Sequence, residues 1–255
     1  MTFWFSLVKA IKNILFIRGE KYDFSGISLR FLANTRPARM VYLESGNDIV
    51  RNDLLQIKFL EKQFKPGQVI WDIGSHYGHY SIFAASVSEH KDRVYSFEPD
   101  AKARIVQEKN IAMNSLQDRI KIMDVAVSKE DGIVDFLELN GNSNSHIING
   151  DMVTDSKVRR ITSRSLDSLL KEIPCPDFVK IDTEGAEIDI LFGGSALLSN
   201  PKVNFICELH PFAWDAFGVT YAAFVDLMQK HNRTITLLDA RKKSSDLPFY
   251  GTVLF

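Results

Sequence analysis

The chain has 255 residues, of which 45% are hydrophobic and 25% are charged, a balance typical of a globular protein with one substantial core. Its net charge of −1 argues against broad electrostatic binding of nucleic acid, although it leaves room for a local basic patch. The two cysteines, Cys175 and Cys207, have neither metal-ligand nor disulfide-framework spacing, so we expect a reducing, cytoplasmic compartment.

Residues 1–17 form an apolar and aromatic segment that Lys9 and Lys12 interrupt. The segment is too short and too charged for a membrane span, and no small-residue cleavage site follows it. At helical spacing its apolar residues fall on one side. This pattern fits a helix docked on the protein's own core, a dimer contact or a peripheral contact with a membrane surface.

Short β-prone pieces at 27–32 and 39–43 follow this segment, with glycine and proline turns around them. We therefore assign residues 1–50 to an N-terminal extension made of a helix and short strands. Residues 51–255 are assigned to the main domain, which opens with a helical pattern that Pro66 and Gly67 end.

Strands and helices then alternate along the main domain. Apolar runs predict strands at 69–73, 94–97, 120–127, 134–139, 178–181 and 203–207. Residues 140–149, rich in Gly, Asn and Ser, predict a loop, and residues 162–171 predict a short helix. This alternation favours a mostly parallel sheet with right-handed crossovers. The β-prone runs at 234–238 and 252–255 are predicted to close an antiparallel edge.

The segment from Val69 to Tyr80 is the centre of this pattern, since an apolar run ends there in an acid and a glycine-bearing turn. It predicts a buried parallel strand, a tight turn and a helix N-terminus. Ligands of open α/β sheets bind at such turns, outside the carboxyl ends of the strands. We expect one cleft to be lined by four acids that follow apolar runs, namely Asp72, Glu98, Asp182 and Glu208.

The turn and the second acid indicate the chemistry of the ligand. An acid in the position of Glu98 can accept two hydrogen bonds from a ribose diol. The turn Gly74-x-x-x-Gly78 lacks the G-x-G-x-x-G arrangement that holds a pyrophosphate, and Asp72 would repel phosphate. A ligand with a ribose, no phosphate and a positively charged amino-acid end suits these residues, and S-adenosylmethionine is such a ligand.

Several motifs resemble those of the FkbM-type methyltransferases, over about residues 50–212. The motifs are Asp72-Ile73-Gly74-Ser75-His76-Tyr77-Gly78-His79-Tyr80-Ser81, Phe97-Glu98-Pro99, Ala126-Val127-Ser128, Ser165-Leu166-Asp167 and, most specifically, the stretch from Asp177 to Glu187. The resemblance implies a Rossmann-like class I methyltransferase fold: an α/β protein with a seven-stranded, mostly parallel sheet and an antiparallel C-terminal edge. It also implies S-adenosyl-L-methionine as cofactor and O-methylation of a hydroxyl on a small molecule or glycan.

By position in the family's motifs, the resemblance implies that Glu98 binds the ribose hydroxyls and that Asp124 binds the adenine amino group. It also implies a cofactor-binding turn made of Asp72, Gly74, Ser75, His76, Tyr77 and Gly78. The pair Ser75-His76 stands where the family commonly has Ala-Asn. Asn110 and Asn114 occupy asparagine positions of the family pattern, for which helix capping and packing are alternatives to cofactor contact.

Methyl transfer is mainly a positioning problem, because a sulfonium methyl is already activated. We predict that Asp182 and Glu184 orient the acceptor or accept its proton, and that His210 is the candidate general base. His146 is a second histidine, predicted to close over the acceptor. A divalent cation on Asp182, Glu184 and Glu208 is an alternative, but strand-end acids need no metal to be explained, so we predict none.

Two other classes of function fit parts of the pattern. A nicotinamide-dependent oxidoreductase would use a similar sheet, but the turn lacks the expected glycines. A non-catalytic binding or scaffold protein that retains the fold is the second alternative. Aromatic residues of the loop 211–222 are predicted either to form a wall for the acceptor or to pack this loop onto the sheet: Phe212, Trp214, Phe217 and Tyr221.

Overall fold

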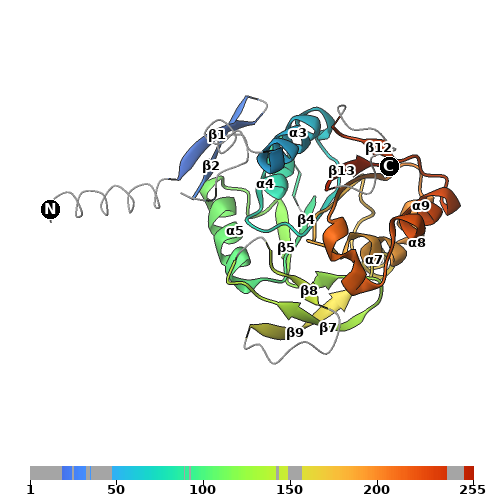
Figure 1. The fold of residues 1–255 in the computed structure, drawn as a ribbon. Coiled ribbons are helices and arrows are strands. Elements are labelled where there is room, and N and C mark those ends of the chain that lie inside the picture. Colours follow the sequence, from blue (N-terminus) through green and yellow to red (C-terminus); the bar gives the residue numbers. More distant parts are fainter. Residues whose placement is uncertain are drawn as a thin grey trace.

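The protein is described by a computed structural model that covers residues 19–24, 26–32, 35, 48–88, 90–91, 93–141, 144–148, 157–239 and 250–255, with the backbone alone at 48–51. These residues form a seven-stranded sheet, a four-stranded sheet and a two-stranded hairpin (Figure 1). The expected N-terminal helix at 1–17 and the β-prone piece at 39–43 lie outside the described residues.

The seven-stranded sheet is mostly parallel, as predicted. Its strands, in order across the sheet, are β12 (Thr236–Leu237), β13 (Gly251–Leu254), β11 (Asn204–Leu209), β10 (Phe178–Ile181), β3 (Ile70–Ile73), β4 (Val94–Phe97) and β5 (Ile120–Met123). The strands from β11 to β5 run parallel, whereas β13 is antiparallel to both β11 and β12. The predicted antiparallel C-terminal edge is confirmed.

Helices cover both faces of this sheet, and every residue of β3, β4 and β10 is buried. Neighbouring residues of β3 point to opposite faces, so Trp71 joins one hydrophobic cluster and Ile70 joins the other. The helices are α3 (Asp48–Gln63), α4 (His79–Val87), α5 (Ala101–Met113), α6 (Leu166–Leu169), α7 (Glu187–Phe192), α8 (Ser195–Ser199), the 3₁₀ helix η1 (Pro211–Phe217) and α9 (Tyr221–Lys230). None of the helices in the described ranges has the length and apolar character of a membrane span.

The hairpin of β1 (Glu20–Phe24) and β2 (Ile27–Phe31) packs on the main domain beside α4 and α5 (Figure 1). Phe24 stacks on Phe83 of α4, with ring centroids 4.4 Å apart. Asn114, which caps the C-terminus of α5, accepts the Arg30 N–H at 2.8 Å and donates to the Arg30 carbonyl at 2.7 Å, while Asn110 of α5 accepts the Leu32 N–H at 2.8 Å. Both asparagines thus have packing roles. The domain boundary at residue 50 stays a prediction.

A second, four-stranded sheet departs from the sequence-based expectation. Its order is β6 (Ala126–Val127), β9 (Val158–Arg164), β7 (Gly132–Leu137) and β8 (His146–Ile148). The prediction of a loop over all of 140–149 was wrong, because β8 occupies part of this segment. The short helix predicted within 162–171 is present as α6, but it begins only at Leu166, because β9 extends to Arg164. Most of β9 is exposed or half-buried, and its three arginines mask the alternation that signals a strand.

Candidate active site

The register of the parallel strands brings the candidate functional residues to one edge of the seven-stranded sheet. Phe97, Ile73, Ile181 and Cys207 are direct neighbours across β4, β3, β10 and β11. The residues that come next form the edge above them: Glu98, Gly74, Asp182 and Glu208. Three of the four acids predicted to share a cleft therefore lie at the same edge of the sheet.

Asp72 is the exception, because it lies one residue inside β3, where it pairs with Ser96 and Lys180. It is fully buried, and one carboxylate oxygen accepts the Ser81 hydroxyl of α4 at 2.6 Å. Burial raises the pKa of Asp72, against the opposing effect of the Lys180 charge. It lines neither of the pockets described below, so its visible role is to hold the start of α4 against β3.

The turn after β3 begins at Gly74, which has a φ of +75°. A Cβ atom at this position would lie 1.8 Å from the carbonyl oxygen of Asp182. The glycine therefore allows the ends of β3 and β10 to approach each other closely. Gly74 lines two pockets, which lie on either side of the turn.

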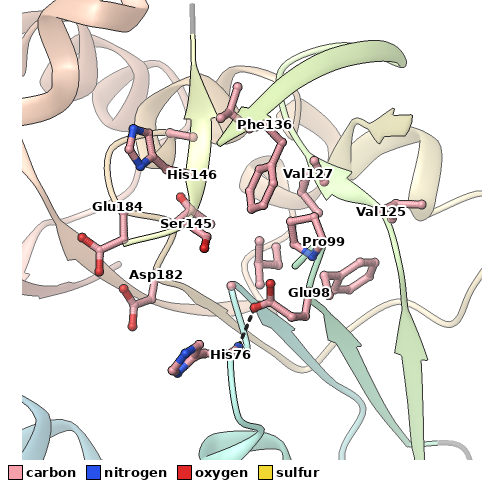
Figure 2. A pocket seen from close by; sticks show the side chains of 17 residues that line it. His76, Glu98, Pro99, Val125, Val127, Phe136, Ser145, His146, Asp182 and Glu184 are labelled. Carbon is pink, nitrogen blue, oxygen red and sulfur yellow. Dashed lines mark hydrogen bonds between the residues drawn. The ribbon is translucent and has the colours of Figure 1, made fainter. Parts of the chain in front are cut away.

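The first, which we call the apolar pocket, has a volume of about 540 Å³. Figure 2 shows Phe136, Val125 and Val127 around one part of it, and Asp182 and Glu184 at the other. Its lining includes Ile73, Phe97, Glu98, Pro99, Val125, Ala126, Val127, Phe136, His146, Ile147, Asp182, Thr183, Glu184 and Ala186. The pocket thus offers an apolar wall with carboxylates at opposite ends.

Glu98 is the buried carboxyl of this pocket and is 6% exposed. Its Oε2 atom accepts the His76 N–H and its Oε1 atom accepts the Asp100 N–H, both at 2.7 Å. Burial raises the pKa of Glu98 to about 7, despite these two hydrogen bonds. Two backbone donors thus fix the carboxylate in a site where its charge is costly.

The other predicted cofactor residues divide into those that line a pocket and those that do not. Ser75 and His76 line pockets, and His76 lies in the wall between the two. The Tyr77 hydroxyl donates to the Gly141 carbonyl at 2.7 Å, and Gly78 immediately precedes α4. Asp124 ends β5 with its side chain 77% exposed, 4.0 Å from Arg104, and it is not part of the lining of the apolar pocket.

The second pocket, the polar pocket, has a volume of about 850 Å³. It is lined by Asp53, Ile57, Gly74, Ser75, His76, His79, Tyr80, Lys180, Asp182, Glu184, Glu208, His210 and Tyr250. Four of these residues also line the apolar pocket: Gly74, His76, Asp182 and Glu184. The two pockets therefore meet at two of the three residues predicted to be catalytic.

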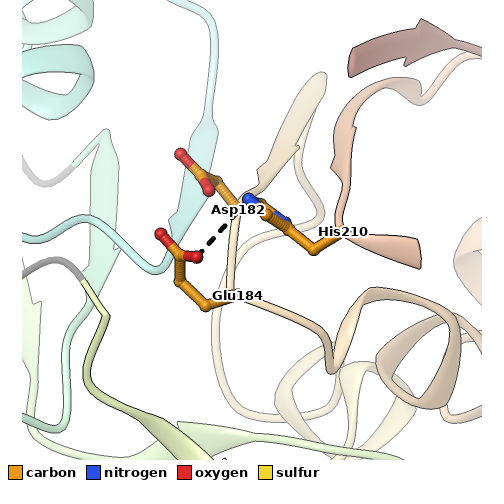
Figure 3. A group of neighbouring side chains, drawn as sticks. All are labelled: Asp182, Glu184 and His210. Atoms are coloured by element: carbon orange, nitrogen blue, oxygen red, sulfur yellow. Dashed lines mark ion pairs between the residues drawn. The ribbon is translucent and has the colours of Figure 1, made fainter. Parts of the chain in front are cut away.

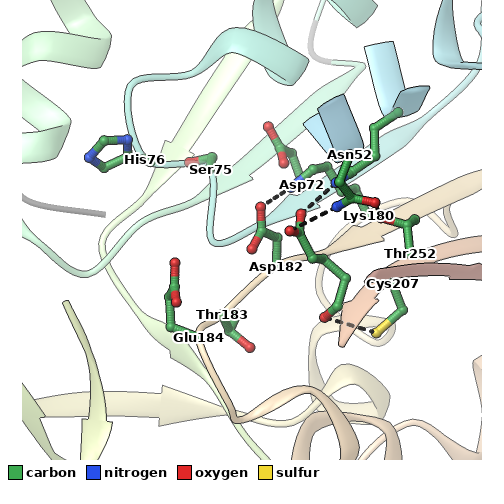
Figure 4. Close-up of polar contacts among 12 residues, drawn as sticks. Asn52, Asp72, Ser75, His76, Lys180, Asp182, Thr183, Glu184, Cys207 and Thr252 are labelled. Carbon is green, nitrogen blue, oxygen red and sulfur yellow. Dashed lines mark hydrogen bonds and ion pairs between the residues drawn. The ribbon is translucent and has the colours of Figure 1, made fainter. Parts of the chain in front are cut away.

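Lys180 is a charged residue of this site that sequence reasoning missed. It is almost fully buried in β10, and its ammonium group donates to Asp182 Oδ2 at 2.9 Å (Figure 4). Burial would raise the pKa of Asp182, but the charges of Lys180 and His210, together with the hydrogen bond from Lys180, outweigh this effect and hold the pKa below its usual range. The signal was present, since a lysine inside a four-residue apolar strand needs a buried partner.

His210 follows β11 directly, and its ring is held by Glu187 of α7. His210 Nδ1 lies 3.0 Å from Glu187 Oε1, and this fully buried carboxylate also accepts the Gly185 N–H at 2.7 Å and the Trp214 indole N–H at 3.3 Å. The nitrogen on the other side of the ring, Nε2, lies 3.6 Å from Glu184 Oε2.

The charges around His210 decide its protonation. Burial would lower the pKa of this imidazole, but the hydrogen bond to Glu187 and the nearby carboxylates outweigh burial and raise the pKa to about 10. The ring is then an imidazolium at neutral pH and has no lone pair to accept a proton. The general-base role of His210 stays a prediction, and it requires the ring to lose this proton first. The pKa of Glu184, in contrast, is raised by burial to about 7.

Glu208 is held by side chains from several parts of the chain. Its carboxylate accepts the amide groups of Asn52 at 3.0 Å and of Gln56 at 2.5 Å, both from α3. It also accepts the hydroxyl of Tyr250, just before β13. These contacts connect α3 and the C-terminal edge to β11, and Figure 4 shows Asn52 near Lys180 at this place.

The aromatic residues of η1 and α9 mainly pack on the core. Trp214 is buried, and Phe217 and Tyr221 pack against the same hydrophobic cluster, which confirms the packing interpretation for these three. Phe212 differs, because it is 74% exposed and its ring lies 5.7 Å from the ring of His210. His146 lines the apolar pocket, where Figure 2 shows it near Glu184.

This sheet, with its antiparallel edge and its glycine turn between two pockets, is that of a class I methyltransferase. The model of the FkbM methyltransferase domain matches residues 72–235, which is more than half of the chain. The chain therefore belongs to the FkbM methyltransferase family, as its motifs indicated.

Two characterised relatives are each 28% identical to this chain. One is the 2-O-methyltransferase NoeI of Sinorhizobium fredii, similar over 56% of this chain and 63% of its own length. The other is the hexuronic acid methyltransferase AglP of Haloferax volcanii, similar over 60% of this chain and 61% of its own length. Among solved structures, the methyltransferase FkbM of Methylobacillus flagellatus has a TM-score of 0.47 and 15% identity, with 86% of this chain and 57% of that chain covered.

Proposed function

We propose that the protein is an S-adenosylmethionine-dependent O-methyltransferase that acts on a hydroxyl of a small molecule or a glycan. The observation that carries this proposal is the meeting of an apolar pocket and a polar pocket at Asp182 and Glu184. Membership of the FkbM methyltransferase family supports it. A methyl donor in one pocket and a hydroxylated acceptor in the other would face each other across these two carboxylates.

The residues of the apolar pocket fit S-adenosylmethionine. Glu98 presents a fixed carboxylate with lone pairs for two ribose hydroxyls, and the apolar wall around Phe136 suits a base. At the other end, Asp182 and Glu184 suit the positively charged amino group and sulfonium. When bound, this cofactor supplies a methyl group that is already activated for transfer to oxygen.

The charges of the pocket disfavour a nicotinamide dinucleotide. Among the described residues that line the apolar pocket there is neither a lysine nor an arginine. Carboxylates at both of its ends would instead repel a pyrophosphate. These observations leave the scaffold hypothesis as the main alternative, and only a binding or transfer assay separates it from an enzyme.

The protein's own contribution to the reaction is to position the acceptor. Asp182 and Glu184 can accept a hydrogen bond from an acceptor hydroxyl and so aim its oxygen at the apolar pocket. Glu184 titrates near neutral pH, because burial raises its pKa to about 7, and it can therefore take up the proton that the hydroxyl loses. Lys180 stays paired with Asp182 and keeps that carboxylate ionised.

A sugar hydroxyl is the acceptor we favour. The relatives are named for 2-O-methylation and for methylation of a hexuronic acid. The polar pocket is large and lined by side chains that exchange hydrogen bonds with hydroxyl groups. The protein spans only 63% and 61% of the lengths of these relatives, so the acceptor has to be found by experiment.

The proposal is tested by methyl transfer from labelled S-adenosylmethionine to a panel of methyl glycosides, with products identified by mass spectrometry. We expect one glycoside or a small group to gain a single methyl group on oxygen. A Glu184→Gln variant should bind the cofactor but transfer the methyl group more slowly. Cofactor binding without transfer to any hydroxylated acceptor would favour the scaffold hypothesis.

A further inference from the structure

The place where the two pockets meet holds three side chains with metal-ligating atoms. One atom from each of Asp182, Glu184 and His210 lies within 4.8 Å of the others. Ligands at about 2.1–2.4 Å from a common cation lie at most about 4.8 Å apart, so this spacing fits a single ion. Figure 3 shows that the three side chains reach the same place from the ends of β10 and β11.

The orientation of His210 is an independent observation outside this cluster. Its Nδ1 atom is 3.0 Å from the fully buried Glu187, which two further N–H groups also hold. This contact turns Nε2 toward Glu184 and the polar pocket. Histidines that bind metals usually donate their second ring nitrogen to a carboxylate in this way, which fixes the ring and makes it a better ligand.

The polar pocket is also rich in carboxyl groups. Four carboxyl groups line it, from Asp53, Asp182, Glu184 and Glu208, against the side chains of Lys180 and His210. Glu187 adds a further carboxylate directly behind His210. A cation between these groups would gain from their combined field, which partial burial strengthens.

We propose that Asp182, Glu184 and His210 Nε2 bind one divalent cation in the polar pocket, and that this cation also takes the acceptor hydroxyl. On binding, the ion displaces to solvent the proton that Nε2 carries in the metal-free protein. Lys180 contacts Asp182 at Oδ2, which leaves Oδ1 for the ion. Glu208, considered from the sequence as a ligand, is engaged by Asn52, Gln56 and Tyr250, and His210 takes its place.

The ligand set indicates the class of metal. Carboxylates favour Mg²⁺ and Mn²⁺, whereas imidazole favours later first-row metals, so a mixed set suits Mn²⁺. The role in methyl transfer rests on the proposed function: a hydroxyl bound to a divalent cation has a lower pKa and a fixed position. The cation would add to the positioning by Asp182 and Glu184, and would not replace the apolar pocket as the cofactor site.

Titration of the full chain with Mn²⁺, followed by the electron paramagnetic resonance signal of the free ion, tests this site without any acceptor. We expect one bound Mn²⁺ per chain. Glu184→Gln and His210→Gln should each weaken binding by about tenfold or more, and Glu187→Gln by about tenfold through the orientation of His210. Glu184→Gln is the safest of these variants, because among the described residues its carboxylate contacts only His210, at 3.6 Å.

Asp53→Asn is the matched control, because it removes one carboxylate from the same pocket without touching the three ligands. It should change Mn²⁺ affinity by less than about threefold, because burial raises the pKa of the Asp53 carboxyl to about 8 and leaves it little charge at neutral pH. Equal losses in Asp53→Asn and Glu184→Gln, or no Mn²⁺ binding by the folded parent, would overturn the proposal. S-adenosylhomocysteine titrated without metal separates the two questions: its binding in the absence of Mn²⁺ binding would reject the cation site and leave the proposed function standing.

Discussion

Glu98 is a buried carboxyl whose two oxygens each accept one backbone N–H, from His76 and Asp100. Burial raises its pKa from 4.5 to about 7, so the folded protein keeps a proton that the unfolded chain releases. The contribution of this group to stability is present below about pH 4.5 and falls as the pH rises toward 7.

The same shift predicts a pH dependence of cofactor binding, because ribose hydroxyls donate to the ionised form. Between about pH 6 and pH 8, the ionised fraction of Glu98 rises from about a tenth to about nine tenths, so affinity for S-adenosylhomocysteine should rise by up to about tenfold. Calorimetry at several pH values measures this. A Glu98→Gln variant should bind S-adenosylhomocysteine more weakly and lose the pH dependence of binding. If the variant keeps this pH dependence, another group causes it.

Gly74 is the residue that lets the ends of β3 and β10 meet. In a Gly74→Ala variant the new Cβ atom would lie 1.8 Å from the carbonyl oxygen of Asp182, at a φ of +75°. The left-handed conformation alone costs about 1–2 kcal/mol, and the overlap requires a backbone shift in addition. We expect urea unfolding to show that the free energy of unfolding falls by more than about 3 kcal/mol, or that the variant does not fold.

Gly26→Ala is the control for this prediction, because Gly26 has a φ of +81° but a Cβ atom there would meet nothing within 4 Å. The free energy of unfolding of this variant should fall by only about 1–2 kcal/mol, which is the cost of the backbone conformation. Equal losses of unfolding free energy in the two variants would show that the close approach of β3 and β10 at Gly74 does not add to the cost of the substitution.

At the scale of elements, Asn110 of α5 and Asn114, which caps its C-terminus, connect the hairpin to the main domain. Asn114 exchanges two hydrogen bonds with the backbone of Arg30, at 2.8 and 2.7 Å. Asn114→Ala removes both, together with the hydrogen bond from Asn114 to the Asn110 carbonyl, at a cost of about 1–3 kcal/mol in the free energy of unfolding. We expect faster hydrogen exchange at the amides of β2, measured by NMR or mass spectrometry.

The matched control is Asn204→Ala, at the start of β11. Within the described residues, its side chain makes only long contacts, with the carbonyls of Asp177 and Lys202 at 3.3 and 3.4 Å. Exchange in β2 should be unchanged in this variant. Unchanged exchange in Asn114→Ala as well would mean that aromatic packing, such as Phe24 on Phe83, holds the hairpin alone.

The elements of the main sheet were predictable because burial dominates them. Runs such as Phe178–Ile181 are buried on both faces, so their apolar residues are continuous and easily recognised. The four-stranded sheet was not predictable by the same reasoning, because β9 is largely exposed and rich in arginine. Its strands are specified by pairing with β7 and β6, which a single sequence does not display.

The same contrast holds for the site. Strand ends located Glu98, Asp182 and Glu208 at one edge, since parallel strands in register end together. The roles of Asp72 and His210 were not predictable, because they depend on side-chain partners. Asp72 is turned toward Ser81, and Glu187 keeps His210 protonated.

At the scale of the whole molecule, the main feature is that different elements build the two pockets. Residues from β3, β4 and the four-stranded sheet build the apolar pocket, whereas α3, β10, β11 and Tyr250 build the polar one. The turn at Gly74 and the carboxylates of Asp182 and Glu184 belong to both. The fold thus brings two chemically different pockets to one shared wall.

The central claim is that the apolar pocket binds S-adenosylmethionine through Glu98. The most direct measurement is calorimetric titration with S-adenosylhomocysteine of the parent, Glu98→Ala and Asp124→Asn, two acids that follow the neighbouring strands β4 and β5. We predict that the parent binds at one site per chain. Affinity should fall by tenfold or more, which is about 1.4 kcal/mol, in Glu98→Ala and should not change in Asp124→Asn. No binding by a well-folded parent, or an unchanged affinity in Glu98→Ala, would contradict the assignment of the cofactor to this pocket. A loss in Asp124→Asn would instead support the adenine contact predicted for Asp124.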